Sequence, residues 1–231
     1  TTTGMMNPLG DIAAIVKAHG KILLVDSMSA FGGVPLDIAE LRIDYIVSSA
    51  NKCIQGVPGF GFVIGRVEHL EKSKGWARSL SLDLYDQWQV MEVSSQWRFT
   101  PPTHVLIAFD KAIEQFDKEG GVAGRNTRYS ENCHTLVAGM SELGFEPLLP
   151  PERQAPIIVT FRMPADPAFD FQTFYDRVKE RGYILYPGKL TVAPSFRVGC
   201  IGHLQTPDIQ AAVDAMKAVL VEMGVASGKS A

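Results

Sequence analysis

The first half of the chain alternates between one amphipathic stretch and three continuous apolar runs. A helix is predicted to begin at Asn7 and Pro8, because asparagine can cap a helix and proline suits its first position, and to end at Gly20. The apolar runs predict buried strands at 21–26, 44–49 and 60–65. Strands that are apolar throughout indicate a sheet covered on both faces, which is typical of the α/β class.

The pattern changes at the sequence LLPP, residues 148–151. Before it, helices are predicted around 83–91, 102–116 and 122–143, and the rest of 66–100 is polar and irregular. After it, shorter elements alternate, with strands at 157–163, 183–187 and 195–202 and helices at 171–181 and from Thr206. The last helix has an apolar stripe with the 3.6-residue period of one buried face: Ile209, Val213, Met216, Leu220 and Met223. We therefore expect a large domain over residues 1–145 and a small α+β domain over 146–231.

Composition and charge exclude several classes of partner. The 231 residues are 46% hydrophobic and 20% charged with a net charge of −3, as in an ordinary globular protein. The chain has no cluster of Lys and Arg, so neither nucleic acid nor an anionic membrane is expected as a partner. The three cysteines, Cys53, Cys133 and Cys200, are far apart and lack the spacing of a zinc site. They predict reduced thiols in a cytoplasmic protein, with no metal.

Two charged residues stand where buried strands end. Asp26 closes the first strand, and Lys52 follows the second at a distance of 26 residues along the chain. Taken singly, the aspartate is an ordinary turn residue and the lysine an ordinary surface charge. Taken together, they face one crevice, because the ends of neighbouring parallel strands meet where open α/β sheets build their sites. A lysine for a Schiff base and an acid for a ring nitrogen suit pyridoxal phosphate as cofactor.

An arginine also stands inside an apolar strand. Arg197 lies in SFRVG, residues 195–199, where an unpaired charge would be costly. The residues support two interpretations equally: a buried structural ion pair, or a bidentate clamp on an anionic substrate. The turn GVPGFG at 56–61 is neither a GxGxxG nor a Walker pattern, and we interpret it as a turn that lets the backbone pass close to a bulky group.

Six stretches together resemble one enzyme family in order and spacing. They are TTTG (1–4), LVDSMSAFGGVPLDI (24–38), SSANKCIQGVPGFGFVI (48–64), RSLSLDLYDQW (78–88), WRFTPPTH (97–104) and SFRVGCIGH (195–203). Over essentially its whole length the chain resembles the fold-type I, class V aminotransferases of the alanine–glyoxylate and serine–pyruvate group. The resemblance implies the aspartate aminotransferase-like fold of the pyridoxal-phosphate-dependent transferases, with part of a large, mostly parallel-sheet domain and a small C-terminal α+β domain.

The resemblance assigns expected roles around the cofactor, pyridoxal 5′-phosphate. Lys52 matches the lysine that binds the cofactor covalently and then moves a proton, and Asp26 matches the partner of the ring nitrogen. Thr1 matches a hydroxyl residue near the cofactor O3′. Met28 matches the side chain packed under the ring, and Asn51 a polar residue near the phosphate.

Two further positions concern the substrate and a second subunit. Arg197 matches the arginine that holds the acid group of the substrate. Thr100 matches a residue that reaches the cofactor phosphate of the neighbouring subunit, which implies a homodimer with shared active sites.

The runs SSANKCIQGVPGF and RSLSLDLY resemble those of family members that act on a phosphonate. They imply transamination of 2-aminoethylphosphonate with pyruvate, giving phosphonoacetaldehyde and L-alanine in phosphonate catabolism. One alternative keeps the chemistry and changes the donor, as in an alanine–glyoxylate or serine–pyruvate aminotransferase. The other is a non-catalytic piece that serves subunit association.

In the family, a long N-terminal region precedes the match to TTTG. It supplies the glycine-rich phosphate loop and the aromatic residue stacked on the cofactor ring, and neither has a counterpart in this chain. We therefore expect these residues to be the C-terminal part of such an enzyme. Alone, they are expected to bind pyridoxal phosphate weakly and to transaminate poorly or not at all.

Overall fold

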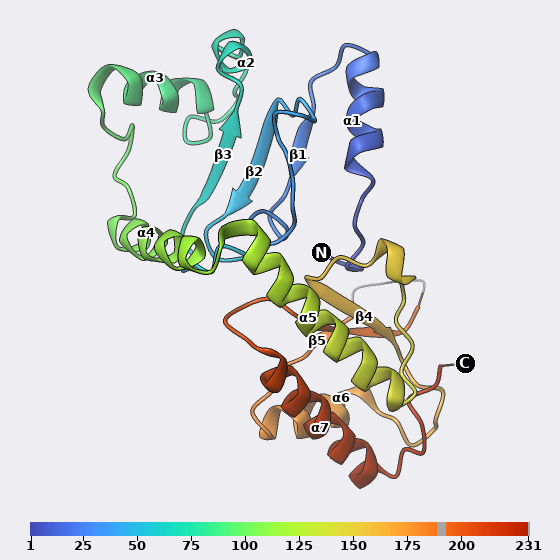
Figure 1. The fold of residues 1–231 in the computed structure, drawn as a ribbon. Coiled ribbons are helices and arrows are strands. Elements are labelled where there is room, and N and C mark those ends of the chain that lie inside the picture. The colour runs from blue at the N-terminus through green and yellow to red at the C-terminus, as the bar shows by residue number, and fades with distance from the viewer. Residues whose placement is uncertain (189–192, 231) are drawn as a thin grey trace. The chain divides into compact units, whose positions relative to one another are not determined.

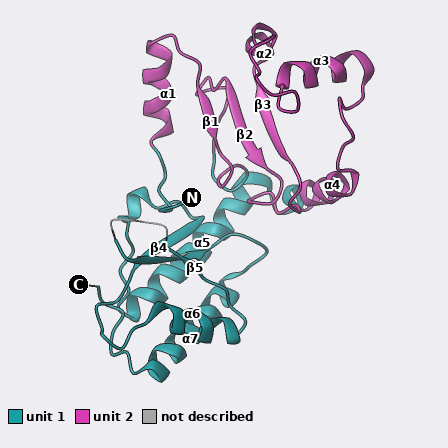
Figure 2. Cartoon of the chain, turned by 180° about the vertical axis from the view of Figure 1, so that it is seen from behind, with its two compact units in different colours: residues 1–7, 32–35, 116–231 teal, residues 8–31, 36–115 magenta. Residues whose placement is uncertain are grey.

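The computed structural model describes residues 1–188 and 193–230, and the chain divides into two compact units (Figure 2). Unit 1 comprises residues 1–7, 32–35 and 116–231, and unit 2 comprises residues 8–31 and 36–115. The helix α5 (Gly121–Glu142) belongs to unit 1, so these units do not divide where a boundary after residue 145 was predicted. The predicted boundary remains a proposal about the domains of the enzyme.

The sheet of unit 2 has three strands in the order β1-β2-β3, visible side by side in Figure 1. They are β1 (Leu24–Asp26), β2 (Tyr45–Ser49) and β3 (Gly61–Gly65). β1 runs parallel to β2, whereas β3 runs antiparallel to it. Of the two pairings in this sheet, one is therefore parallel, and it is the one that joins the strands leading to Asp26 and Lys52.

Helix α1 (Leu9–Ala18) covers one face of this sheet. Its Ala13 packs with Leu23, Ile43 and Ile46 in a small apolar core. The opposite side of β1 is open, since Leu24 is 66% exposed, and the prediction of a fully buried strand over 21–26 is wrong. The predicted capping by Asn7 is also not seen, because Pro8 is the N-cap residue and no side chain caps the helix.

Three helices follow β3: α2 (Val67–Lys72), α3 (Leu84–Ser94) and α4 (Thr103–Lys118), of which α4 belongs to unit 2 up to residue 115. The polar stretch 66–82 gave no sign of α2, which has no buried residue. Asp83 caps α3 by accepting a hydrogen bond from the Asp86 N–H at 3.1 Å. Phe109 of α4 packs its ring against Phe60 and Phe62, with centroids 5.1 and 5.8 Å away, so α4 lies against the start of β3.

A buried carboxylate ties α1 and α2 to the start of β2. The Asp44 side chain is fully buried, forms an ion pair with Lys17 of α1, and accepts a hydrogen bond from the Leu23 N–H at 2.7 Å. His69 Nε2 of α2 lies 3.4 Å from the same carboxylate. Burial alone would raise the pKa of Asp44, but the hydrogen bonds from Lys17 and Leu23 and the nearby Lys17 and His69 charges hold that pKa below its ordinary value.

Asp44→Asn is expected to cost about 3 kcal/mol of unfolding free energy at neutral pH, because it leaves partly buried cations without their partner. The folded-state pKa of Asp44 is lowered, so its contribution is fully present above the unfolded value of about 3.9 and is lost as the pH falls through the folded value. The gap between wild type and variant should therefore shrink at about pH 3.

Urea unfolding followed by tryptophan fluorescence measures this difference in unfolding free energy. The signal reports on unit 2, because Trp76, Trp88 and Trp97 all lie in that unit. Asp11→Asn on the exposed side of α1 is the control, and it should change stability by no more than about 0.5 kcal/mol. A gap of the same size at both pH values would contradict the assigned role of the Asp44 charge.

Unit 1 packs three helices on one face of an antiparallel sheet of order β4-β6-β5. The strands are β4 (Ile158–Arg162), β5 (Tyr186–Pro187) and β6 (Ser195–Gly199). The helices are α5, α6 (Phe171–Glu180) and α7 (Thr206–Met223), and a short 3-10 turn, η1, spans Pro151–Arg153. Of the predicted stripe on α7, Ile209, Val213, Met216 and Leu220 are buried and Met223 is partly buried, which confirms that pattern.

No helix among the described residues is long and apolar enough to cross a membrane.

Candidate active site

Asp26 and Lys52 lie at the carboxyl ends of two neighbouring parallel strands. Asp26 is the last residue of β1 and pairs with Val47, while Lys52 comes three residues after the end of β2. Both strand ends open at the same edge of the sheet. The two side chains are exposed, and within residues 1–188 and 193–230 neither forms an ion pair. Both charges are therefore available to a ligand at this edge.

Lys52 stands in a tight turn, residues 50–56, which we name the lysine turn. The Gln55 N–H donates to the Lys52 carbonyl at 2.9 Å, and the Gly56 N–H donates to the Ala50 carbonyl at 2.8 Å. Cys53 and Ile54, directly after the lysine, are buried, whereas Lys52 is exposed. The turn is thus anchored by its inward side chains and directs the amine outward.

Met28 and Asn51 flank the same edge of the sheet. The Met28 Cε lies 3.8 Å from the position of a β-carbon at Gly61, and Gly61 pairs with Ser49 at the end of β2. Asn51 precedes the lysine, and both Met28 and Asn51 are half-buried. Thr100 is exposed and stands three residues before α4.

The glycines of the turn GVPGFG have a different neighbour from the one expected. A β-carbon at Gly56 would lie 2.8 Å from the Ala50 carbonyl oxygen and 3.2 Å from Phe109. At Gly59 it would lie 2.7 Å from Val105, which like Phe109 is part of α4. Close packing of this turn on its own backbone and on α4 therefore accounts for these glycines without a bulky ligand.

Arg197 is placed by the alternation of β6. Phe196 and Val198 point into the core of unit 1, so Arg197 lies on the opposite face, where it is only 6% exposed. Its Nε donates to the Pro187 carbonyl at 3.3 Å, and its guanidinium carbon is 5.8 Å from the centre of the Tyr186 ring. Among the described residues Arg197 has no ion pair, so the contacts that the structure shows for it are those with Pro187 and Tyr186.

The first residues of the chain run beside β4 in the same unit as Arg197. The Thr160 hydroxyl, on β4, donates to the Thr2 carbonyl at 3.4 Å, and Thr160 pairs directly with Arg197. Gly4 has a φ of 85°, and a β-carbon there would lie 2.1 Å from the Ile158 carbonyl oxygen, so glycine is required. Thr1 is exposed. The residues that follow it are held against β4, close to Thr160, which pairs with Arg197.

The candidate residues fall into two groups, each described within its own unit. Asp26, Met28, Asn51, Lys52 and Thr100 belong to unit 2, and Thr1 and Arg197 belong to unit 1. Sequence reasoning missed the residues around Arg197, namely Thr160 and Tyr186. A polar residue in the otherwise apolar run IIVTF was a usable signal for Thr160.

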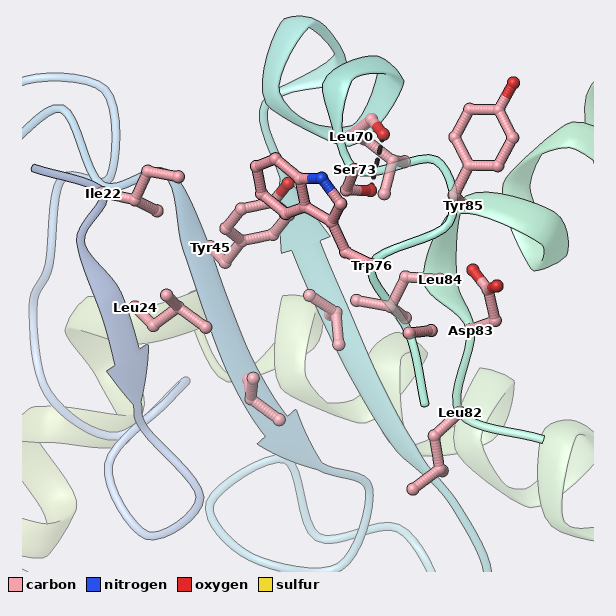
Figure 3. Close-up of a pocket in the computed structure, with 13 residues that line it drawn as sticks. Ile22, Leu24, Tyr45, Leu70, Ser73, Trp76, Leu82, Asp83, Leu84 and Tyr85 are labelled. Carbon is pink, nitrogen blue, oxygen red and sulfur yellow. Dashed lines mark hydrogen bonds between the residues drawn. The ribbon is translucent and has the colours of Figure 1, made fainter. Parts of the chain in front are cut away.

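An apolar pocket of about 320 Å³ lies on the open face of the unit 2 sheet (Figure 3). Leu24, Tyr45, Trp76, Leu82 and Tyr85 line it together with eight other residues. Neither Asp26 nor Lys52 is among them, so this pocket is separate from the candidate active site.

Comparison with known proteins supplies the family. The family profile described as aminotransferase class-V matches residues 1–198. The chain belongs to this family. Pyridoxal phosphate is the family's cofactor, and a solved neighbour is titled a PLP-bound phosphoserine aminotransferase, from Trichomonas vaginalis. The exposed carboxylate and amine at the edge of the unit 2 sheet fit that cofactor, because an acid and a free amine are the groups its ring nitrogen and aldehyde require.

Two curated relatives have closely similar names. A protein of Vibrio vulnificus (strain CMCP6) named 2-aminoethylphosphonate–pyruvate transaminase is 55% identical over 218 residues, which cover 94% of this chain and 59% of the relative. A protein of Paraburkholderia xenovorans (strain LB400) named 2-aminoethylphosphonate–pyruvate transaminase 1 is 55% identical over 225 residues, covering 97% of this chain and 58% of the relative. The chain thus spans less than two thirds of the length of the relatives it matches.

Solved structures agree on the fold. Pyridoxamine–pyruvate aminotransferase from Mesorhizobium loti matches with a TM-score of 0.87 at 22% identity, covering 99% of this chain and 60% of the other. Ureidoglycine–glyoxylate aminotransferase from Bacillus subtilis matches with a TM-score of 0.86 at 18% identity, covering 98% and 59%. The predicted α/β fold of fold-type I aminotransferases is confirmed, and identities this low carry the fold alone.

Proposed function

We propose that this chain is part of an aminotransferase that moves the amino group of 2-aminoethylphosphonate to pyruvate, giving phosphonoacetaldehyde and L-alanine. One observation carries the proposal: an exposed aspartate and an exposed lysine, each free of an ion pair in the described residues, close two neighbouring parallel strands at one edge of a sheet. The name shared by relatives about half identical to this chain supports the choice of substrates.

When bound, pyridoxal phosphate would supply an aldehyde that takes up the amino group and a ring that accepts electrons. Lys52 would attach it covalently and, with its amine released, take a proton from the donor carbon and return it. Asp26 would hold a proton on the ring nitrogen. Met28 would pack against the ring, and Asn51 and Thr1 would donate hydrogen bonds near the phosphate and O3′.

Arg197 would hold the acid group of the substrate. Its guanidinium is buried against Tyr186 and Pro187, so it is desolvated before an anion arrives, and a bidentate contact with a phosphonate or a carboxylate is then stronger than at the surface. The arginine thus fits an anionic substrate but leaves phosphonate and carboxylate both open, and the name of the relatives supports the phosphonate.

We propose a homodimer with shared active sites, in which Thr100 reaches the cofactor phosphate of the second subunit. In support, the segment that leads to Thr100 carries large apolar side chains exposed to solvent, among them Leu80, Leu82, Val93 and Trp97. Such a gathering is typical of a protein interface. The three cysteines are thiols and not disulfides, which fits a reducing compartment, and we place the protein in the cytoplasm.

A comparison of amino donors tests the function. The complete gene product that contains these residues is assayed with 2-aminoethylphosphonate and with serine, using pyruvate as acceptor. We expect kcat/KM to be at least about 10-fold higher for the phosphonate, since a site built for a dianion discriminates against a smaller charge. A higher value for serine would instead indicate a serine–pyruvate or alanine–glyoxylate aminotransferase.

Arg197→Lys is expected to raise KM for the amino donor by about 10- to 100-fold with a smaller change in kcat, because lysine keeps the charge but loses the bidentate contact. Steady-state kinetics with donor and acceptor varied separately measure the split. Arg153→Lys, exposed on η1 of the same unit, is the matched control and should leave KM unchanged. If the role of Arg197 is purely structural, the Arg197→Lys substitution should lower the stability of the protein and leave KM for the amino donor unchanged.

A further inference from the structure

Two buried side chains join the loop after β1 to the end of β2. We name residues 27–31 the β1 loop. The Ser48 hydroxyl, on β2, donates to the Ser27 carbonyl at 3.3 Å, and the Cys53 thiol, in the lysine turn, donates to the Ser29 carbonyl at 3.2 Å. Ser48 is 1% exposed and Cys53 is fully buried. The segment that follows Asp26 and the segment that carries Lys52 are thus linked by side chains of two different elements.

The backbone of the β1 loop is ordered by its own hydrogen bonds. The Ser27 N–H donates to the Val47 carbonyl at 2.9 Å, which extends the parallel pairing by one residue. The N–H groups of Ala30 and Phe31 donate to the Ser27 carbonyl at 3.1 and 3.0 Å. Asp26 accepts from the Met28 N–H at 2.9 Å. The loop is therefore a closed turn. Beyond the last backbone pair, Ser48 and Cys53 hydrogen-bond it to the end of β2 and the lysine turn, and Phe31 packs its ring against Phe62 of β3 at 5.3 Å between ring centroids.

Lys52 and Cys53 point in opposite directions. The lysine side chain is exposed at the sheet edge, while the next side chain is buried and bonded to the β1 loop. A thiol suits this place, because it is a weak donor that loses little when it leaves water, whereas a hydroxyl would lose more. Any shift of the β1 loop is thereby passed to the residue adjacent to the lysine.

We propose that Ser48 and Cys53 form a clasp that sets the separation between Asp26 and Lys52. They are positioning residues: no contact with the cofactor is assigned to either, and each acts through the backbone next to the residue it positions. The inference rests on the proposed function, since the separation matters because one cofactor ring must meet both the acid and the amine. Misplacement of a reacting group by about 1 Å can cost up to 100-fold in rate.

Two substitutions of Cys53 separate hydrogen bonding from packing. Cys53→Val fills the buried volume but removes the donor, and Cys53→Ser keeps a donor but is smaller and more polar. If Cys53 only packs, valine should be the better replacement in every measurement. If Cys53 positions the β1 loop, Cys53→Ser should stay closer to wild type in loop exchange and cofactor capture, although Cys53→Val is the more stable protein. Cys133→Val, the same change at a buried thiol in unit 1, is the matched control.

The first readout needs no cofactor. Amide hydrogen exchange of a peptide covering residues 26–31 should become about 5- to 10-fold faster in Cys53→Val, and stay near wild type in Cys53→Ser and Cys133→Val. The second readout is capture of pyridoxal phosphate at Lys52, trapped with borohydride and located by peptide mass. Capture at a fixed low cofactor concentration should fall about 10-fold in Cys53→Val and less than 2-fold in Cys53→Ser.

The outcomes separate the clasp from the function. Unchanged exchange of residues 26–31 in Cys53→Val overturns the clasp, whatever the cofactor does. The positioning role is overturned if Cys53→Val exchanges residues 26–31 faster but captures as much pyridoxal phosphate as wild type. It is also overturned if cofactor capture by the variants follows the order of their unfolding free energies. Absence of capture at Lys52 in the wild-type protein overturns the proposed cofactor site and the positioning role with it, while the exchange result then still reports on the clasp itself.

Discussion

Replacing Lys52 with alanine is expected to abolish covalent capture of pyridoxal phosphate and to lower the transamination rate by roughly 10⁴-fold. Two functions are lost at once: the amine that attaches the cofactor and the group that moves the proton, which alone contributes about 10²- to 10⁴-fold. The fold should survive, because the Lys52 side chain is exposed and the lysine turn is held by backbone hydrogen bonds and by Cys53 and Ile54.

The measurement pairs kinetics with borohydride trapping and peptide mass mapping in the complete gene product. Lys72→Ala is the matched control, since Lys72 is an exposed lysine at the end of α2 in the same unit. It should retain both capture and rate. Labelling of the peptide around residue 72 at the expense of the one around residue 52, or a Lys52→Ala protein with normal turnover, would assign the chemistry to another residue.

The sequence predicted element types well where the pattern is local. Helices α3 to α7 lie close to their predicted ranges, because signals such as the Asp83 cap of α3 and the apolar stripe of α7 are encoded in neighbouring residues. Burial of the strands was predicted less well: residues 22–25 are all apolar, yet Leu24 is 66% exposed, and Ile64 in the third predicted buried strand is 43% exposed. An apolar run shows that a strand suits burial on both faces, but which segment covers each face depends on distant parts of the polypeptide.

The candidate site shows the same limit. That Asp26 and Lys52 face one sheet edge followed from the strand ends, whereas Met28, Asn51, Thr1 and Thr100 came only from the family resemblance. For Arg197 the residues left an ion pair and a substrate clamp equally open. The neighbours of Arg197 in the structure come from β4 and β5, and the sequence of a strand does not state which strands pair with it.

The clasp illustrates what neither pattern nor resemblance offered. Cys53 stands in a run that is specific in sequence, but nothing local says that its thiol meets the Ser29 carbonyl 24 residues earlier. That contact follows from the parallel pairing of β1 and β2, which brings the two strand ends side by side. The role of a side chain at this sheet edge thus depends on how β1 and β2 pair as well as on the residue type.

Asp26→Asn is expected to lower the transamination rate by about 10²- to 4 × 10³-fold while leaving the fold intact. The loss corresponds to removing one partner of a charge pair with the ring nitrogen, a change worth about 3–5 kcal/mol, at about 1.4 kcal/mol for each factor of ten. The asparagine oxygen can still accept the Met28 N–H that Asp26 Oδ1 binds at 2.9 Å, so the β1 loop keeps its hydrogen bond and only the charge is removed.

Asp37→Asn is a closely matched control for this experiment. Asp37 is also exposed in unit 2, and its carboxylate likewise accepts backbone N–H groups just ahead of it, from Ala39 and Glu40 at 2.9 Å. The two variants make the same chemical change in the same local role, so any difference in rate reports on what lies beyond the loop. Because Lys52 stays in place, Asp26→Asn should still capture the cofactor and fail mainly in proton transfer. Equal rates for the two variants would mean that Asp26 only closes its own turn.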